Sequence, residues 1–222
     1  SPGRFIPIAE QTGLILPLGA WVLKEGCRLL GEWQHDPRLR HLKLSLNVSV
    51  RQFQQPDFVE QVTTTLRATG APPERLTLEL TESLLMSDPE GTIDKMRRLR
   101  QLGIRFALDD FGTGYSSLAY LKSLPLDTLK IDIAFVRDLT LDMQATPIAA
   151  TIIALAESLG LDVIAEGVET REEVDYLKQH TAIRIAQGYH FSKPLSADAV
   201  LELVQTRRLW SPASEEAGDS VH

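Results

Sequence analysis

The stretch IRFALDDFGTGYSSL at residues 104–118 begins as an apolar run typical of a buried strand and ends in two adjacent aspartates, Asp109 and Asp110. Burying a carboxylate costs several kcal/mol unless it is paired or bound to a cation, and two neighbouring carboxylates repel each other. We therefore expect this strand to end at a site where cations offset the charge. Taken alone, the pair also fits a turn closed by an Asx hydrogen bond.

Similar apolar segments recur along the chain and alternate with amphipathic ones, after a mostly helical N-terminal region. The predicted strands are 42–48, 75–81, 104–110, 127–132, 162–168 and 183–189, and the predicted helices are 57–69, 89–102, 142–159, 170–180 and 196–206. Helix starts are marked by Asp88 before Pro89, by Thr170 and by Ser196. Such alternation predicts an α/β fold with a parallel sheet, either doubly wound or closed into a barrel.

Polar side chains recur at the carboxyl ends of the six predicted strands. They are Asn47, Glu79, Asp109 with Asp110, Lys130, Glu166 and Gln187. In a (β/α)8 barrel these ends converge on one rim, whereas in an open sheet only those near the switch point meet. We therefore expect a TIM-type (β/α)8 barrel. Because the chain supplies six strands, the N-terminal strands of that barrel are expected to be missing from it.

These rim residues are rich in hard oxygen donors and include no histidine or cysteine, which favours Mg²⁺ or Mn²⁺ over zinc or copper. Two such ions can share a bridging carboxylate and activate water against a phosphate ester, with Lys130 holding or deprotonating that water. Singly, each residue has a simpler explanation: Lys130 as a strand lysine that reaches solvent, Asn47 as a turn former. Their recurrence on six consecutive strands favours the site.

The composition narrows the class of protein. A formal net charge of −7 disfavours DNA or RNA as a partner. No apolar run has the length that spans a bilayer, and the single cysteine, Cys27, fits packing in a reducing compartment, so we expect a cytoplasmic location. The chain begins with Ser1 rather than methionine, and we interpret it as a fragment of a longer polypeptide. The small, polar residues 207–222 predict a disordered tail after a domain at 1–206.

Several segments resemble a known family, the EAL-type cyclic di-GMP phosphodiesterases. SPGRFIPIAEQTGLI at the start is similar to the stretch that follows the Glu-Ala-Leu motif of that family. The other matching segments are NVSVRQF (47–53), LELTES (78–83), ALDDFGTGYSSL (107–118), LKIDIAFV (129–136), VIAEGVET (163–170) and QGYHFSKPL (187–195). The resemblance implies a TIM-type barrel that opens cyclic di-GMP to linear pGpG with two Mg²⁺ or Mn²⁺ ions. It also implies a homodimer in bacterial signalling, with a sensory or diguanylate cyclase domain upstream.

Carried over by position, the resemblance implies a role for each matching residue. The implied metal ligands are Asn47, Glu79, Asp109 (shared), Asp110 and Glu166. Lys130 and Gln187 are implied to contact the catalytic water. Glu82 is implied to anchor the loop that follows the aspartate pair, which includes Phe111, Gly112, Thr113 and Gly114. Glu169 is implied to support the site, and Pro194 and Leu195 are implied to lie beside a guanine base.

One departure from the family pattern concerns the N-terminus. The motif glutamate, a metal ligand, and the arginine after it, a phosphate contact, are not in the chain. We therefore expect the chain as it stands to have weak or no activity, while Asp109→Asn or Lys130→Ala nearly abolishes turnover in a complete domain. Two alternatives stay open: a non-catalytic cyclic di-GMP receptor that signals through its dimer interface, and a metal-dependent lyase with Lys130 as the base.

Overall fold

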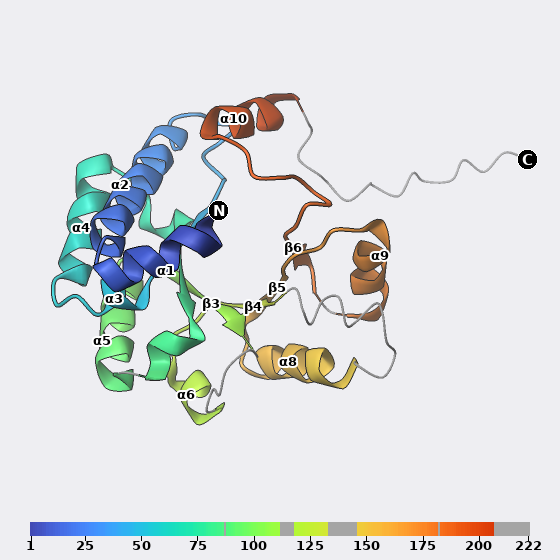
Figure 1. Cartoon of the computed structure of the whole chain (residues 1–222). Coiled ribbons are helices and arrows are strands. Elements are labelled where there is room, and N and C mark those ends of the chain that lie inside the picture. The colour runs from blue at the N-terminus through green and yellow to red at the C-terminus, as the bar shows by residue number, and fades with distance from the viewer. Residues whose placement is uncertain (87, 112–117, 133–145, 182, 207–222) are drawn as a thin grey trace, which may run out of the picture.

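One parallel sheet of six strands organises the part of the chain that the structure, a computed structural model, describes: residues 1–222 except 87, 112–117, 133–145, 182 and 207–222 (Figure 1). The strands are β1 (Leu44–Val48), β2 (Leu76–Thr81), β3 (Arg105–Phe111), β4 (Thr128–Ile131), β5 (Asp162–Ala165) and β6 (Ile185–Ala186). Each strand pairs in parallel with the next one along the chain. This sequential order is that of a barrel wall. In a doubly wound sheet, the order of the strands would reverse at a switch point.

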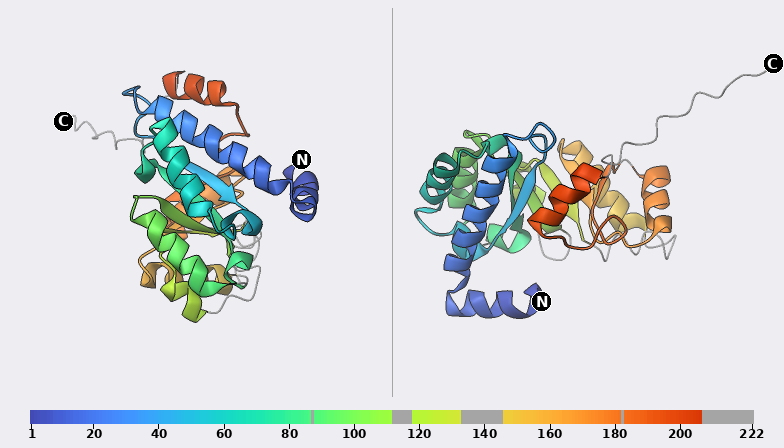
Figure 2. Two further views of the ribbon diagram at one scale, coloured as in Figure 1. Left: turned by 90° about the vertical axis from the view of Figure 1, so that its left-hand side faces the viewer. Right: turned by 90° about the horizontal axis from the view of Figure 1, so that it is seen from above.

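Helices connect the strands and lie around the sheet. They are α1 (Pro2–Thr12), α2 (Ile15–Trp33), α3 (Val50–Phe53), α4 (Phe58–Thr69), α5 (Pro89–Arg100), α6 (Leu118–Ser123), α8 (Thr146–Ser158), α9 (Arg171–His180) and α10 (Ala197–Thr206), with short 3-10 turns η1 (Pro73–Arg75) and η2 (Glu82–Met86). Figure 1 shows α2, α4 and α5 beside the earlier strands and α8 and α9 beside the later ones, and the view from above in Figure 2 shows strands between α2 and α8. Within the described ranges, no helix has both the length and the apolar character needed to cross a bilayer.

The helix starts predicted from the sequence have the expected capping contacts. The Asp88 carboxylate accepts a hydrogen bond from the Gly91 backbone N–H at 3.0 Å, ahead of α5. Thr170 and Glu173 form a reciprocal capping box at the start of α9. Each cap satisfies backbone donors that the first turn of a helix leaves without an intrahelical partner.

Alternation along β1 and β2 turns apolar side chains toward the core and polar side chains toward the other face. In β2, Leu76, Leu78 and Leu80 are almost fully buried in the core. In β1, Val48 is buried while its neighbour Asn47 is exposed. The helices pack against the apolar face, so the polar residues are left for the other face and for the strand ends.

The pairing between β3 and β4 shifts by one residue at their carboxyl ends. Asp109 and Asp110 together fall opposite the single residue Lys130, which is the arrangement of a β-bulge. Asp110 has a φ of 54°, in the left-handed region. The flanking pairs are Leu108 with Leu129 and then Phe111 with Ile131. The extra residue also returns Phe111 to the apolar core that contains Leu108, so β3 extends one residue beyond its predicted end.

Candidate active site

The side chain of Lys130 lies at the centre of a carboxylate cluster at the carboxyl ends of the strands. Its Nζ is 2.7 Å from Glu166 Oε1, 2.8 Å from Glu79 Oε2 and 3.1 Å from Asp109 Oδ1. Only 4% of the Lys130 side chain is exposed. The structure therefore brings together four of the residues that sequence analysis selected, from β2, β3, β4 and the end of β5; we call them the Lys130 cluster.

Lys130 carries a firmly held positive charge. Burial by itself would lower its pKa, but the hydrogen bonds to Glu166 and Glu79 and the nearby charge of Asp109 outweigh burial and raise the pKa above its usual value. An amine that binds its proton this tightly is a poor base. The cluster therefore favours Lys130 as a hydrogen-bond donor and disfavours the lyase alternative, in which it abstracts a proton.

The carboxylates around Lys130 carry more negative charge than the lysine neutralises. Burial raises the pKa of Glu166 to about 7, and the neighbouring charge of Asp109 adds to this effect although Lys130 opposes it. Burial and the charges of Asp109 and Asp132 likewise raise the pKa of Asp110. An additional cation would relieve both effects, because it stabilises the ionised carboxylates.

Three carboxylates of the site are close enough to bind one ion. Oxygen atoms of Asp109, Asp110 and Glu166 all lie within 4.8 Å of one another. The bulge explains how two successive residues contribute, because successive side chains of a regular strand point to opposite faces. An all-oxygen donor set of this kind fits Mg²⁺ or Mn²⁺.

A cleft of about 740 Å³ adjoins Asn47, a predicted metal ligand at the end of β1. Asn47 lines it and is paired in register with Glu79 of the Lys130 cluster. Arg51, which was not among the site residues predicted from the sequence, lines the same cleft and is exposed. The sequence feature that could have indicated Arg51 is its place four residues after Asn47 in NVSVRQF; in the structure it lies in the short helix α3.

The remaining described candidates lie at or beyond the strand ends. Gln187 is exposed, and its backbone N–H donates to the Ala165 carbonyl at 2.8 Å, one strand away from Glu166. Glu169 is exposed, and its backbone N–H donates to Glu173 Oε2 at 2.7 Å. Pro194 and Leu195 are exposed. For Gln187, Pro194 and Leu195, the described contacts include none with the side chains of the Lys130 cluster.

The predicted loop and its anchor are only partly visible. Glu82 is buried at the start of η2, directly after β2, and Phe111 is buried at the end of β3. Gly112, Thr113 and Gly114 lie outside the described residues. The proposed contact between Glu82 and this loop therefore stays a prediction.

Comparison with known proteins identifies a family. The model of the EAL domain matches residues 1–194. The cyclic di-GMP phosphodiesterase NbdA of Pseudomonas aeruginosa is 41% identical over 207 residues, which are 93% of this chain and 26% of that protein. Across the curated relatives compared, the chain spans about a quarter to a third of their length, from 24% to 33%.

Solved structures agree with this family and with the barrel. The MucR phosphodiesterase of Pseudomonas aeruginosa, in complex with c-di-GMP, matches with a TM-score of 0.85 and 38% identity, over 90% of this chain and 80% of that chain. A manganese and cyclic di-GMP complex of Klebsiella pneumoniae BlrP1 matches with a TM-score of 0.70 and 31% identity, over 81% of this chain and 45% of that chain.

Proposed function

Since the chain belongs to the EAL domain family, we propose that it is a metal-dependent phosphodiesterase domain that hydrolyses cyclic di-GMP to linear pGpG in bacterial second-messenger signalling. The observation that carries this proposal is the Lys130 cluster with its adjoining aspartate, Asp110. A buried lysine among carboxylates, at the end of a barrel-type sheet where this fold has its active sites, is a costly arrangement that function explains better than stability.

Divalent cations fit the donor set of this site. Asn47, Glu79, Asp109, Asp110 and Glu166 would hold two Mg²⁺ or Mn²⁺ ions, with Asp109 shared between them. When bound, such ions lower the pKa of water and stabilise negative charge on phosphoryl oxygens. The raised pKa values of Glu166 and Asp110 support this proposal, because a bound cation would stabilise the ionised form of both carboxylates.

The residues of the chain would orient the water and the phosphodiester. The Lys130 ammonium donates a hydrogen bond to the attacking water, and Gln187 contacts the same water from the end of β6. The water oxygen forms a bond to phosphorus while the bond from phosphorus to the 3′ oxygen breaks. One proton leaves the water and one is taken up by the 3′ oxygen, so that pGpG retains a 5′ phosphate.

The cleft beside Asn47 would receive the rest of the ligand. Its volume of about 740 Å³ is within the range of small-molecule sites. Arg51, at the wall of this cleft, is placed to pair with a phosphate oxygen, an interaction for which guanidinium groups are well suited. Homodimerisation, a cytoplasmic location, and the contacts of Glu169, Pro194 and Leu195 with the site or a guanine base stay predictions.

The test is incubation of the chain with cyclic di-GMP and Mn²⁺, followed by chromatography, with a parallel sample in EDTA. Slow release of pGpG that requires Mn²⁺ supports the hydrolase, and loss of this release in Asp109→Asn supports the assigned site. Because the motif glutamate is absent from the chain, binding of cyclic di-GMP without conversion favours the receptor alternative only if a complete domain gives the same result. If the chain neither binds nor converts cyclic di-GMP, the proposal is refuted.

A further inference from the structure

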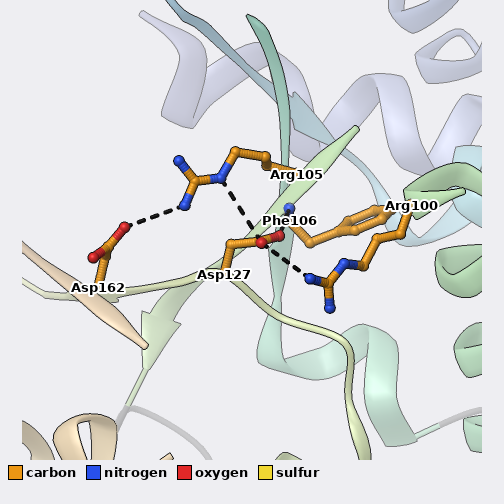
Figure 3. Close-up of polar contacts among 5 residues, drawn as sticks. All are labelled: Arg100, Arg105, Phe106, Asp127 and Asp162. Atoms are coloured by element: carbon orange, nitrogen blue, oxygen red, sulfur yellow. Dashed lines mark hydrogen bonds and ion pairs between the residues drawn. The ribbon is translucent and has the colours of Figure 1, made fainter. Parts of the chain in front are cut away.

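A polar network joins the amino ends of the strands, opposite to the ends that carry the Lys130 cluster (Figure 3). At its centre is Asp127, the residue before β4, which makes two hydrogen bonds to Phe106 of β3. The Asp127 backbone N–H donates to the Phe106 carbonyl at 2.9 Å, and the Phe106 backbone N–H donates to Asp127 Oδ2, also at 2.9 Å. The start of the β3–β4 pairing is thus held by main chain and side chain together.

The carboxylate of Asp127 has this role because β4 begins only at Thr128. The Phe106 N–H points toward β4 at a position that lies before the first residue of β4. There the side chain of Asp127, rather than a backbone carbonyl of β4, accepts its hydrogen bond. A backbone donor buried without an acceptor costs about 1–3 kcal/mol. The Asp127 carboxylate supplies the acceptor and so extends the pairing by one position at the amino end.

Two arginines keep that carboxylate in place. Arg100, at the end of α5, lies with Nη2 3.3 Å from Asp127 Oδ1, and Arg105 lies with Nε 3.8 Å from the same oxygen. Arg105 also pairs with Asp162 of β5 at 3.2 Å, and the Asp162 backbone N–H donates to the Asp127 carbonyl at 3.0 Å. Only 16% of the Asp127 side chain is exposed, so its contacts are less screened than surface ion pairs.

The position of the bulge depends on this starting register. From Phe106 the β3–β4 pairs run in step to Leu108 opposite Leu129, and the additional residue of β3 emerges only after them. If the amino end slipped by one residue, Phe106 and Leu108 would leave the apolar face. With the amino end held, the additional residue falls at Asp109 and Asp110, where both carboxylates approach Glu166.

We propose that Asp127 is a positioning residue for the metal site: it holds the register of β3 on β4 so that the bulge presents both Asp109 and Asp110 to divalent cations. This inference rests on the proposed function in one respect, namely that the aspartate pair binds such ions. The bulge itself can be measured without any metal, which separates the two proposals.

The test compares Asp127→Ala and Asp127→Asn with the wild-type chain. The asparagine keeps an acceptor for the Phe106 N–H but loses the ion pairs with Arg100 and Arg105. The matched control is Ile153→Val in α8, which shortens a buried aliphatic side chain, leaves the polar groups of the network unchanged and costs about 1 kcal/mol of stability. Each protein is titrated with Mn²⁺ by electron paramagnetic resonance well below its melting temperature, and peptide-level hydrogen exchange is recorded in EDTA.

Asp127→Ala is expected to weaken Mn²⁺ binding about tenfold, as loss of supporting residues does at other metal sites, and to accelerate exchange selectively across residues 105–111. Asp127→Asn is expected to fall between it and the wild type, and it carries the test alone if the alanine variant does not fold. Ile153→Val is expected to melt earlier with unchanged Mn²⁺ affinity.

Unchanged affinity and unchanged exchange across 105–111 in both Asp127 variants would overturn the positioning role while leaving the proposed function intact. Absence of Mn²⁺ binding by the wild-type chain would overturn the metal part of both proposals. In that case, selective exchange at 105–111 would still show that Asp127 holds the bulge.

Discussion

Replacing Lys130 by methionine keeps the length of the side chain but removes the cation that three carboxylates contact. The three oxygens lie 2.7, 2.8 and 3.1 Å from Nζ, and only 4% of the lysine side chain is exposed. Removing one partner of a buried ion pair costs about 3–5 kcal/mol, because the remaining charge is left uncompensated. For a chain of this length, that corresponds to a fall in melting temperature of roughly 10 °C.

The assay is thermal and urea unfolding of Lys130→Met and wild type at pH 7.5, in EDTA and in Mn²⁺. Because the ammonium and a metal ion compete for the same oxygens, Mn²⁺ is expected to stabilise the variant more than it stabilises the wild type. The cost of the substitution is also expected to shrink near pH 5, where Glu166, with a pKa of about 7, is protonated in the folded chain. Any turnover of cyclic di-GMP that the wild type shows in Mn²⁺ is expected to be lost in Lys130→Met.

Lys24→Met, at an exposed position of α2, is the matched control and is expected to leave the melting temperature within about 1 °C. If Lys130→Met melted with the wild type in EDTA, the cluster would not be held by this cation. Equal stabilisation of both proteins by Mn²⁺ would contradict the competition between lysine and metal for the carboxylates.

Three further predictions follow from individual residues. In EDTA, raising the pH from about 4.5 to 7 is expected to destabilise the wild type by on the order of 1 kcal/mol relative to Glu166→Gln. The reason is that the pKa of Glu166, about 7 in the folded chain, exceeds its unfolded value, so the folded chain binds more protons. If the urea midpoints of the two proteins changed equally with pH, this expectation would be refuted. Asp110→Gly is expected to raise stability in EDTA by about 1 kcal/mol, since glycine adopts the left-handed φ without strain, while Mn²⁺ binding weakens; lower stability would contradict the strain. Thr170→Ala is expected to cost about 1 kcal/mol through loss of the α9 cap without changing Mn²⁺ affinity, as unfolding and titration would show.

Local pattern was sufficient to predict most elements of the fold. The observed strands begin and end within a few residues of the predicted ones, because apolar alternation in segments such as Leu76–Thr81 is a local property of the chain. The largest difference is at the sheet edge, where the strand predicted at 183–189 is Ile185–Ala186. An edge strand is paired on one side only, so its length depends on what lies beside it.

The composition of the site was also readable from the sequence, since carboxylates, an asparagine and a lysine recur at strand ends. Their arrangement was not, because it depends on contacts between residues distant along the chain. Asp109 and Asp110 share one side of the site only through a bulge against Lys130, about 20 positions later. Likewise, Asp127 and Phe106, 21 positions apart, meet only through the pairing of β3 with β4.

The sequence by itself thus determined the order of strands and helices and the chemical character of the rim. Only the tertiary structure decided which charges meet, how firmly Lys130 holds its proton, and why Glu166 binds one up to about pH 7. The physical reason is that periodicity depends on near neighbours, whereas register, burial and the electric field at a buried group depend on the whole fold.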